Sequence, residues 1–188
     1  SNDNNTMSFN NGQLPGESTA PLNWDVSQVT AIDDMFRQAT AFNQDLSLWN
    51  TNNVTTLDDT FRGATLFNNG DEPGKSNKPL NWDVSNVIDM DDVFRNAKSF
   101  NQDISSWNTS KVTDMDDMFY KASSFNQPLN NWDVSNVTNM NNMFNSALAF
   151  NQNISSWNVG KVKDMDNMFD NASVFNQDIS SWDVSNVD

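Results

Sequence analysis

The feature that most constrains this chain is a sequence unit that recurs with a period of 25 residues. Four successive units begin with Phe-Asn-Gln, and each carries a tryptophan seven residues after its phenylalanine. The units begin at Phe9, Phe42, Phe67, Phe100, Phe125, Phe150 and Phe175, and their tryptophans are Trp24, Trp49, Trp82, Trp107, Trp132, Trp157 and Trp182. One unit cannot bury its own apolar face, so the repeat predicts stacked units whose rings form a common core.

Two periodicities meet inside each unit. In 131–135 apolar and polar residues alternate, which predicts a short strand with one buried face. In 137–147 apolar residues recur at three- and four-residue spacing, which predicts a short helix or helical turn. We therefore predict an α/β repeat: a right-handed, leucine-rich-repeat-like solenoid of seven coils of about 25 residues. It would have a parallel strand ladder on one face and short helical turns on the other.

Domain organisation follows from the same repeat. Residues 1–188 are predicted to form a single domain. In two units the first phenylalanine and the tryptophan are fifteen rather than seven residues apart, because turn-rich stretches are inserted at 10–18 and 68–76. Both insertions leave the unit at the same point, so both should project from one edge. The last unit ends without a visible polar cap, which predicts a fragment of a longer array.

Composition excludes several functional classes. The chain has no Cys and no His, which removes disulfides, thiolate nucleophiles, histidine bases and the usual zinc ligands. Ten basic residues against twenty-five acidic ones give a net charge of −15, which argues against nucleic acid and against an anionic membrane surface. No apolar run is long enough to insert into a membrane. We predict no enzyme activity and no cofactor, with calcium as the one possible exception.

The residue after each tryptophan alternates strictly between Asp and Asn. It lies on the exposed side of the predicted strand, where a regular polar surface suits a protein or glycan partner. The predicted partner-binding residues are Asn81, Asp83, Ser85, Asn108, Asn131, Asp133, Ser135 and Asn158. The alternative is that this face only keeps the protein soluble.

Aspartates cluster at the start of most of the predicted helical turns. Calcium prefers such oxygen ligands, although the spacing of known calcium loops is missing. The candidate ligands are Asp89, Asp91, Asp92, Asp114, Asp116 and Asp117. Helix capping is the competing explanation.

Two further alternatives come from repeated positions. The carboxylate pairs of a glycosidase are single features of a cleft, whereas these aspartates recur along the chain. Threonines also recur at one position, Thr30, Thr55, Thr113 and Thr138, interrupted by Ile88 and Lys163. A regular threonine row leaves an ice-binding solenoid as a third possibility.

The segments Trp132–Phe144 and Phe150–Trp157 carry a family resemblance. They resemble the BspA-type leucine-rich-repeat surface proteins, and more narrowly their branch of unknown function in mycoplasma lipoproteins. The resemblance implies extracellular or cell-surface display and, in some relatives, adhesion. The expected function is therefore adhesion or binding of a protein or carbohydrate partner on a cell surface. The alternative is a structural spacer stabilised by calcium.

Overall fold

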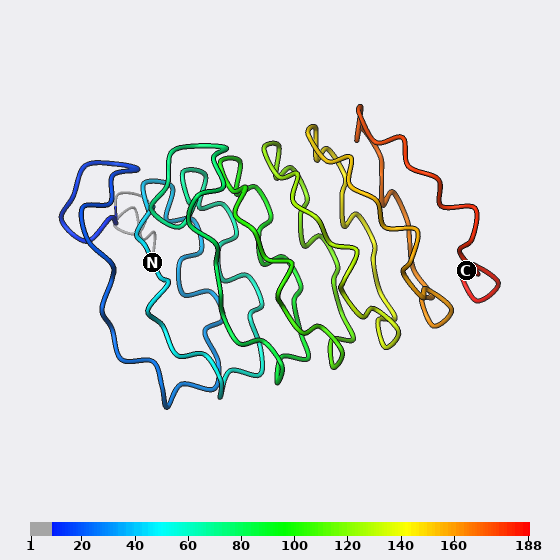
Figure 1. Ribbon diagram of the computed structural model, residues 1–188, viewed down its shortest axis with the longest axis horizontal. Helices are drawn as coiled ribbons and strands as arrows, with labels where there is room; N and C mark the ends of the chain where they lie inside the picture. The colour runs from blue at the N-terminus through cyan, green and yellow to red at the C-terminus, as the bar shows by residue number, and fades with distance from the viewer. Residues whose placement is uncertain (1–8) are drawn as a thin grey trace, which may run out of the picture.

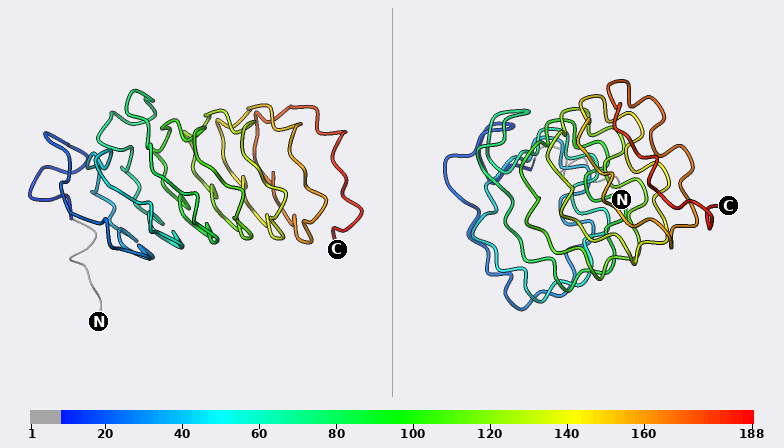
Figure 2. Two further views of the ribbon diagram at one scale, coloured as in Figure 1. Left: turned by 60° about the horizontal axis from the view of Figure 1, so that its bottom comes forward. Right: turned by 45° about the vertical axis from the view of Figure 1, so that its right-hand side comes forward.

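The structure is a computed structural model that describes residues 9–188, so the first eight residues of the predicted domain lie outside it. The chain winds into a stack of coils, with the N-terminal coil at one end and the C-terminal coil at the other (Figure 1). Two further views show the same succession of coils along the long axis (Figure 2). Each coil therefore contacts mainly the coils before and after it, as expected of a repeat protein.

Two series of phenylalanine rings fill the interior, one pair in each repeat. The rings of Phe36 and Phe42 have centroids 4.0 Å apart, and other pairs lie at 3.8–4.2 Å. Each ring also stacks on its equivalent in the next coil, for example Phe36 on Phe61 at 5.6 Å and Phe42 on Phe67 at 5.8 Å. The predicted aromatic core is confirmed. Such rings dominate the apolar area that one coil hides against another.

The predicted α/β architecture is wrong. Residues 9–188 contain no helix, and their only β-structure is a set of isolated parallel bridges. The bridges join Pro21 to Asp45, Ala31 to Thr56, Thr56 to Asp89, Asp89 to Asp114, Asp114 to Asn139, and Asn139 to Asp164. Segment 131–135 is not a strand, and 137–147 is not a helical turn. The right-handed leucine-rich-repeat-like solenoid, with its strand ladder and helical turns, is therefore corrected to a stack of turns.

The physical reason lies in a recurring double turn, two overlapping turns at 33–38, 58–63, 91–96, 116–121, 141–146 and 166–171. Alternate N–H groups point in different directions. In 141–146 the N–H of Asn142 donates to Asp166 O in the next coil, whereas that of Asn145 donates back to Asn142 O. Asn142 has φ 52° and Ser146 has φ 58°, and such left-handed residues interrupt a helix. Near the start of each double turn one Asp or Asn, such as Asp92, Asp117 or Asn142, supplies this left-handed conformation instead of capping a helix.

Asparagine side chains join the coils at the Phe-Asn-Gln motif. The N–H of Asn68 donates to Asn43 Oδ1 at 2.7 Å, and the N–H of Asn101 donates to Asn68 Oδ1 at 2.8 Å. Six such bonds of 2.7–3.0 Å run through the stack. The indole N–H of each tryptophan after the first donates to a Leu or Ile carbonyl of the preceding coil, as Trp107 does to Leu80 O at 2.7 Å. These bonds satisfy buried polar groups that no sheet would pair.

The two insertions project from one edge of the stack, as predicted (Figure 1). They are held alike. The amide of Asn10 donates to Glu17 O at 2.9 Å, and that of Asn68 donates to Lys75 O at 3.0 Å. Their equal bonding makes them two copies of one loop.

Candidate functional site

The predicted partner-binding residues lie in the segments around the tryptophans and are exposed or half-buried. Asp83 Oδ1 accepts the N–H of Ser85 at 3.0 Å, and Asp133 Oδ1 accepts that of Ser135 at 3.0 Å. Such Asx turns reverse the chain direction. We name this surface the Asx face: Asn81, Asp83, Ser85, Asn108, Asn131, Asp133, Ser135 and Asn158.

Asparagine makes the same turn in the alternate coils of the Asx face. Asn108 Oδ1 accepts the N–H of Ser110 and Asn158 Oδ1 accepts that of Gly160, both at 3.2 Å. The backbone therefore needs an oxygen acceptor at this position but not a negative charge.

These aspartates are held in the ionised state. The backbone N–H and then the hydroxyl of Ser85 lower the pKa of Asp83, and nearby Lys111 lowers it further. The pKa of Asp133 is lowered in the same way, by the serine two residues on and then by Lys161. Each lysine Nζ also donates to an asparagine of the preceding coil, at 2.7 Å. The Asx face thus presents fixed anions beside fixed cations.

The predicted metal ligands fall into three rows of equivalent positions at and just before the double turns: Asp89 and Asp114, Asp91 and Asp116, and Asp92 and Asp117. In the first row, Asp89 Oδ1 accepts the N–H of Asp91 at 3.0 Å, and Asp114 Oδ1 accepts that of Asp116 at 3.0 Å. Asp89 and Asp114 are thus occupied with local turns of the kind seen on the Asx face.

The third row, Asp92 and Asp117, pairs with arginines that were not among the predicted ligands. Arg62 lies 2.6 Å from Asp92, and Arg95 contacts both Asp92, at 3.1 Å, and Asp117. We name the whole zigzag of ion pairs the Arg–Asp ladder: Asp34, Arg37, Asp59, Arg62, Asp92, Arg95 and Asp117. Each inner carboxylate therefore joins two coils.

A sequence signal for the Arg–Asp ladder was present. In three units an arginine follows an aspartate by three residues, at Asp34 and Arg37, Asp59 and Arg62, and Asp92 and Arg95. This signal was missed because helix capping explains the aspartates without any need for a nearby cation.

Burial and mutual repulsion disfavour ionisation of several carboxyls in these rows. Desolvation, then the charges of Asp92 and Asp116, raises the pKa of Asp91 to about 8. Desolvation, then Asp117, raises that of Asp116 to about 6. Desolvation also raises the pKa of Asp92 to about 6, against the opposing effect of Arg95. Asp116 Oδ1 and Asp117 Oδ1 are buried without a hydrogen-bond partner.

The six candidate calcium ligands do not form a ready-made site. Among the residues that the structure describes, no group of three acidic side chains converges closely enough to hold a metal ion. The prediction of bound calcium stays untested.

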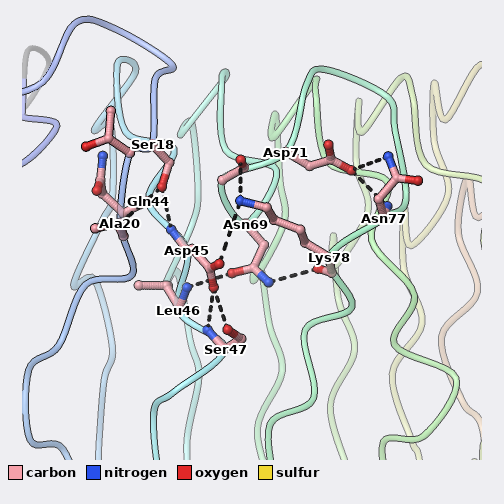
Figure 3. A network of polar contacts seen from close by, with 12 residues as sticks. Ser18, Ala20, Gln44, Asp45, Leu46, Ser47, Asn69, Asp71, Asn77 and Lys78 are labelled. Atoms are coloured by element: carbon pink, nitrogen blue, oxygen red, sulfur yellow. Dashed lines mark hydrogen bonds and ion pairs between the residues drawn. The ribbon is translucent and has the colours of Figure 1, made fainter.

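The two insertion loops meet in a polar network along their shared edge (Figure 3). The N–H of Asp45 donates to Ser18 Oγ at 3.2 Å, and Asp45 Oδ2 lies 3.7 Å from Lys78 Nζ. Lys78 Nζ also donates to Gly70 O at 2.9 Å. Asp45 therefore links Ser18 of the first loop to Lys78, which in turn holds Gly70 of the second loop.

Shallow hollows lie at the ends of the stack. One of about 580 Å³ is lined by Lys161, Lys163 and Asn186 among others. Another, of about 450 Å³, is apolar and includes Phe169 and Trp182. In the described part of the chain no helix has the length and apolar character needed to cross a membrane.

Comparison with known proteins gives a family but no activity. The model of the family described as "Mycoplasma protein of unknown function, DUF285" matches residues 5–78, 73–147 and 127–188. No curated protein and no solved structure matches significantly. The mycoplasma part of the resemblance is confirmed by this match, whereas a BspA-type leucine-rich repeat is not.

Proposed function

We propose that this chain, which belongs to the Mycoplasma repeat family of unknown function DUF285, is a non-catalytic protein of the cell surface or extracellular space. Its role is to bind a protein or glycan partner through the Asx face and the two insertion loops. Family membership and the repeated sequence support a surface repeat protein. The partner-binding part of the proposal rests on the Asx face.

The observation that carries the proposal is that the turns of the Asx face do not need the negative charge of their aspartates. Asn108 and Asn158 complete the same turn as Asp83 and Asp133 without any charge. Exposed, ionised carboxylates at a fixed spacing give electrostatic complementarity to a partner. Their regular repetition suits an extended protein surface or a repeated glycan rather than one small molecule.

The test uses the asparagine coils as a guide to harmless substitutions. The double variant Asp83→Asn and Asp133→Asn keeps the turn acceptors and removes two charges. The wild type is screened against glycan and host-protein arrays, and each hit is titrated with the variant. We expect at least about tenfold weaker binding, since each lost charged contact is worth about 1 kcal/mol or more.

The matched control changes the same chemistry elsewhere. Asp164 and Asp178 are exposed and accept the same kind of turn bond, but they lie outside the Asx face. Asp164→Asn and Asp178→Asn should leave binding unchanged and melt at the same temperature as the test variant. Equal losses in both variants would show that only net charge matters, and no binding to any array would remove the adhesion proposal.

A calcium-stabilised spacer is the second candidate, and the unpartnered oxygens of Asp116 and Asp117 favour it. Calcium would have to draw these side chains together, which would stabilise the folded state by ligand linkage. Thermal unfolding with millimolar calcium and with chelator decides: a rise of several degrees supports the spacer, and no shift eliminates it.

Ice binding loses support from the hydroxyl geometry. The hydroxyls of Thr55 and Thr138 donate to carbonyls of the preceding coil, at 3.1 and 3.2 Å, and that of Thr113 does so at 3.3 Å. Their protons are engaged along the stack rather than directed outward to order water.

A further inference from the structure

Two Asn-Gly pairs occur in the chain, and the repeat places them at equivalent points of the two insertion loops. Asn11 and Asn69 both have φ 52°, and the glycines after them have φ 77° and 76°. Each pair occupies the centre of a tight turn closed by one backbone bond of 3.0 Å. Left-handed conformation at both central positions is what Asn-Gly turns favour. The two pairs are therefore alike in sequence and backbone.

Their surroundings differ completely. Asn69 is fully buried. Its Oδ1 accepts the N–H of Leu46 at 2.8 Å, and its Nδ2 donates to Lys78 O at 2.9 Å. The next N–H, of Gly70, donates to Asn43 Oδ1 at 3.0 Å. The preceding coil thus engages the Oδ1 of Asn69 and the N–H of Gly70, and the end of the loop itself engages the Nδ2 of Asn69.

At the first loop no coil of the described chain precedes the pair. Asn11 and Gly12 are both exposed, and within residues 9–188 neither the side chain of Asn11 nor the N–H of Gly12 makes a hydrogen bond. A Cβ at Gly12 would meet nothing within 4 Å. The reacting groups of this pair are therefore free to rotate and open to water.

Free Asn-Gly pairs undergo a well-defined reaction. The glycine N–H loses its proton to solvent base, and the nitrogen attacks the asparagine Cγ. A C–N bond forms, ammonia leaves, and a five-membered succinimide results. Water then opens the ring at either carbonyl, giving aspartate or isoaspartate, and no oxidant or reductant takes part. Glycine favours the attack because it has no side chain to obstruct the approach.

We propose that Asn11 is a site of spontaneous deamidation in the folded protein, and that the equivalent Asn69 is protected by the coil packed against it. The product adds a negative charge to the first loop, three residues from the exposed Leu14. With isoaspartate the backbone also lengthens by one carbon. The first loop thus acquires a chemically distinct form with age, while the second loop keeps its original amide.

The test compares the two sites within one molecule. The folded protein is incubated for days in mildly alkaline buffer, digested with trypsin, and examined by tandem mass spectrometry. Tryptic cleavage after Arg37, Arg62 and Lys75 separates Asn11 from Asn69. We expect the mass change from amide to carboxylate at Asn11, and at least about tenfold slower conversion at Asn69, because reaction there requires local opening.

Two controls make the result decisive. In denaturant both pairs should react at similar rates, because the local sequences are alike and the packing is gone. In the folded Asn11→Gln variant the first loop should stay unmodified, since glutamine forms its ring far more slowly. Equal rates at the two sites in the folded protein would overturn the proposal. So would the absence of reaction at Asn11 while the denatured protein reacts.

Discussion

The double-turn edge is charged in one part of the stack and carries amides in the next. From Asp34 to Asp117 it holds the Arg–Asp ladder, whereas in the following coil the equivalent positions are Asn142 and Asn145. The backbone conformation is the same in both parts, since Asp117 and Asn142 both have φ 52°. The asparagine pair even keeps one side-chain bond, of 3.1 Å.

The comparison teaches that the coil is specified by its left-handed residues and its aromatic core, not by the charges on this edge. Asp and Asn share the tolerance of left-handed backbone that the double turn needs. Charges can therefore be exchanged for amides without changing the fold. The charges instead determine how strongly the stability of the stack depends on pH and on intact ion pairs.

The largest expected effect is from breaking one link of the Arg–Asp ladder. Arg62→Ala leaves the buried carboxylates of Asp59 and Asp92 each with one partner fewer. Removing one partner from buried ion pairs costs about 3 kcal/mol. The same truncation in the amide part, Asn145→Ala, should cost about 1 kcal/mol. Urea denaturation followed by tryptophan fluorescence measures both, and equal costs would contradict the distinction between the two parts.

The second effect is a loss of stability as pH rises from about 5 to about 8. Asp91 has its pKa raised to about 8, and Asp58 and Asp116 have theirs raised to about 6. A carboxyl with a raised folded-state pKa stabilises the fold at low pH, and this contribution is lost as pH rises through the folded pKa. We expect the melting temperature to fall by a few degrees over this range.

A matched variant isolates the cause of that pH effect. Asp91→Asn and Asp116→Asn copy the amide part, where Asn141 occupies the same position. The variant should lose most of the pH dependence and melt higher than wild type at about pH 8. The lowered pKa values of Asp83 and Asp133 act only in more acidic solution, below their ordinary value of 3.8. An unchanged slope in the variant would assign the effect to other groups.

The stack, its aromatic core and the common edge of the insertions could be predicted from the sequence. The positions of Phe42, Phe67 and Trp49 predict which side chains are buried because such rings have no other favourable place in a repeat. The local backbone was mispredicted. Three- and four-residue spacing in 137–147 is shared by a helix and by two overlapping turns that bury the same side chains.

The candidate site, like the fold, could be predicted only in part from the sequence. The exposure of Asp83 and Asp133 was predictable from alternation, but the finding that their charge is structurally redundant needed the hydrogen bonds of Asn108 and Asn158. The Arg–Asp ladder depends on contacts between coils. The paired residues of neighbouring coils lie far apart in the chain, and composition alone does not show which aspartate contacts Arg62.

The smallest expected effect is the most informative about what the ladder does. Asp92→Asn, Arg95→Asn and Asp117→Asn together convert a charged segment into the amide pattern of Asn142 and Asn145. Replacing a whole buried ion-pair group is often close to neutral, whereas removing one partner is costly. We expect the triple variant to lie within about 1 kcal/mol of wild type and Arg95→Asn alone to lose about 3 kcal/mol.

Urea denaturation of the single and triple variants at low and high salt measures that difference. The favourable coupling between the three substitutions should appear as non-additivity, because the residues share one set of contacts. Arg95 also lies 4.6 Å from the ring of Tyr120, so a modest loss common to both variants is expected from that contact. If the triple variant is as unstable as the single one, the charges themselves hold these coils together. If it recovers, the ladder is an exchangeable edge on a backbone that the turns and rings already determine.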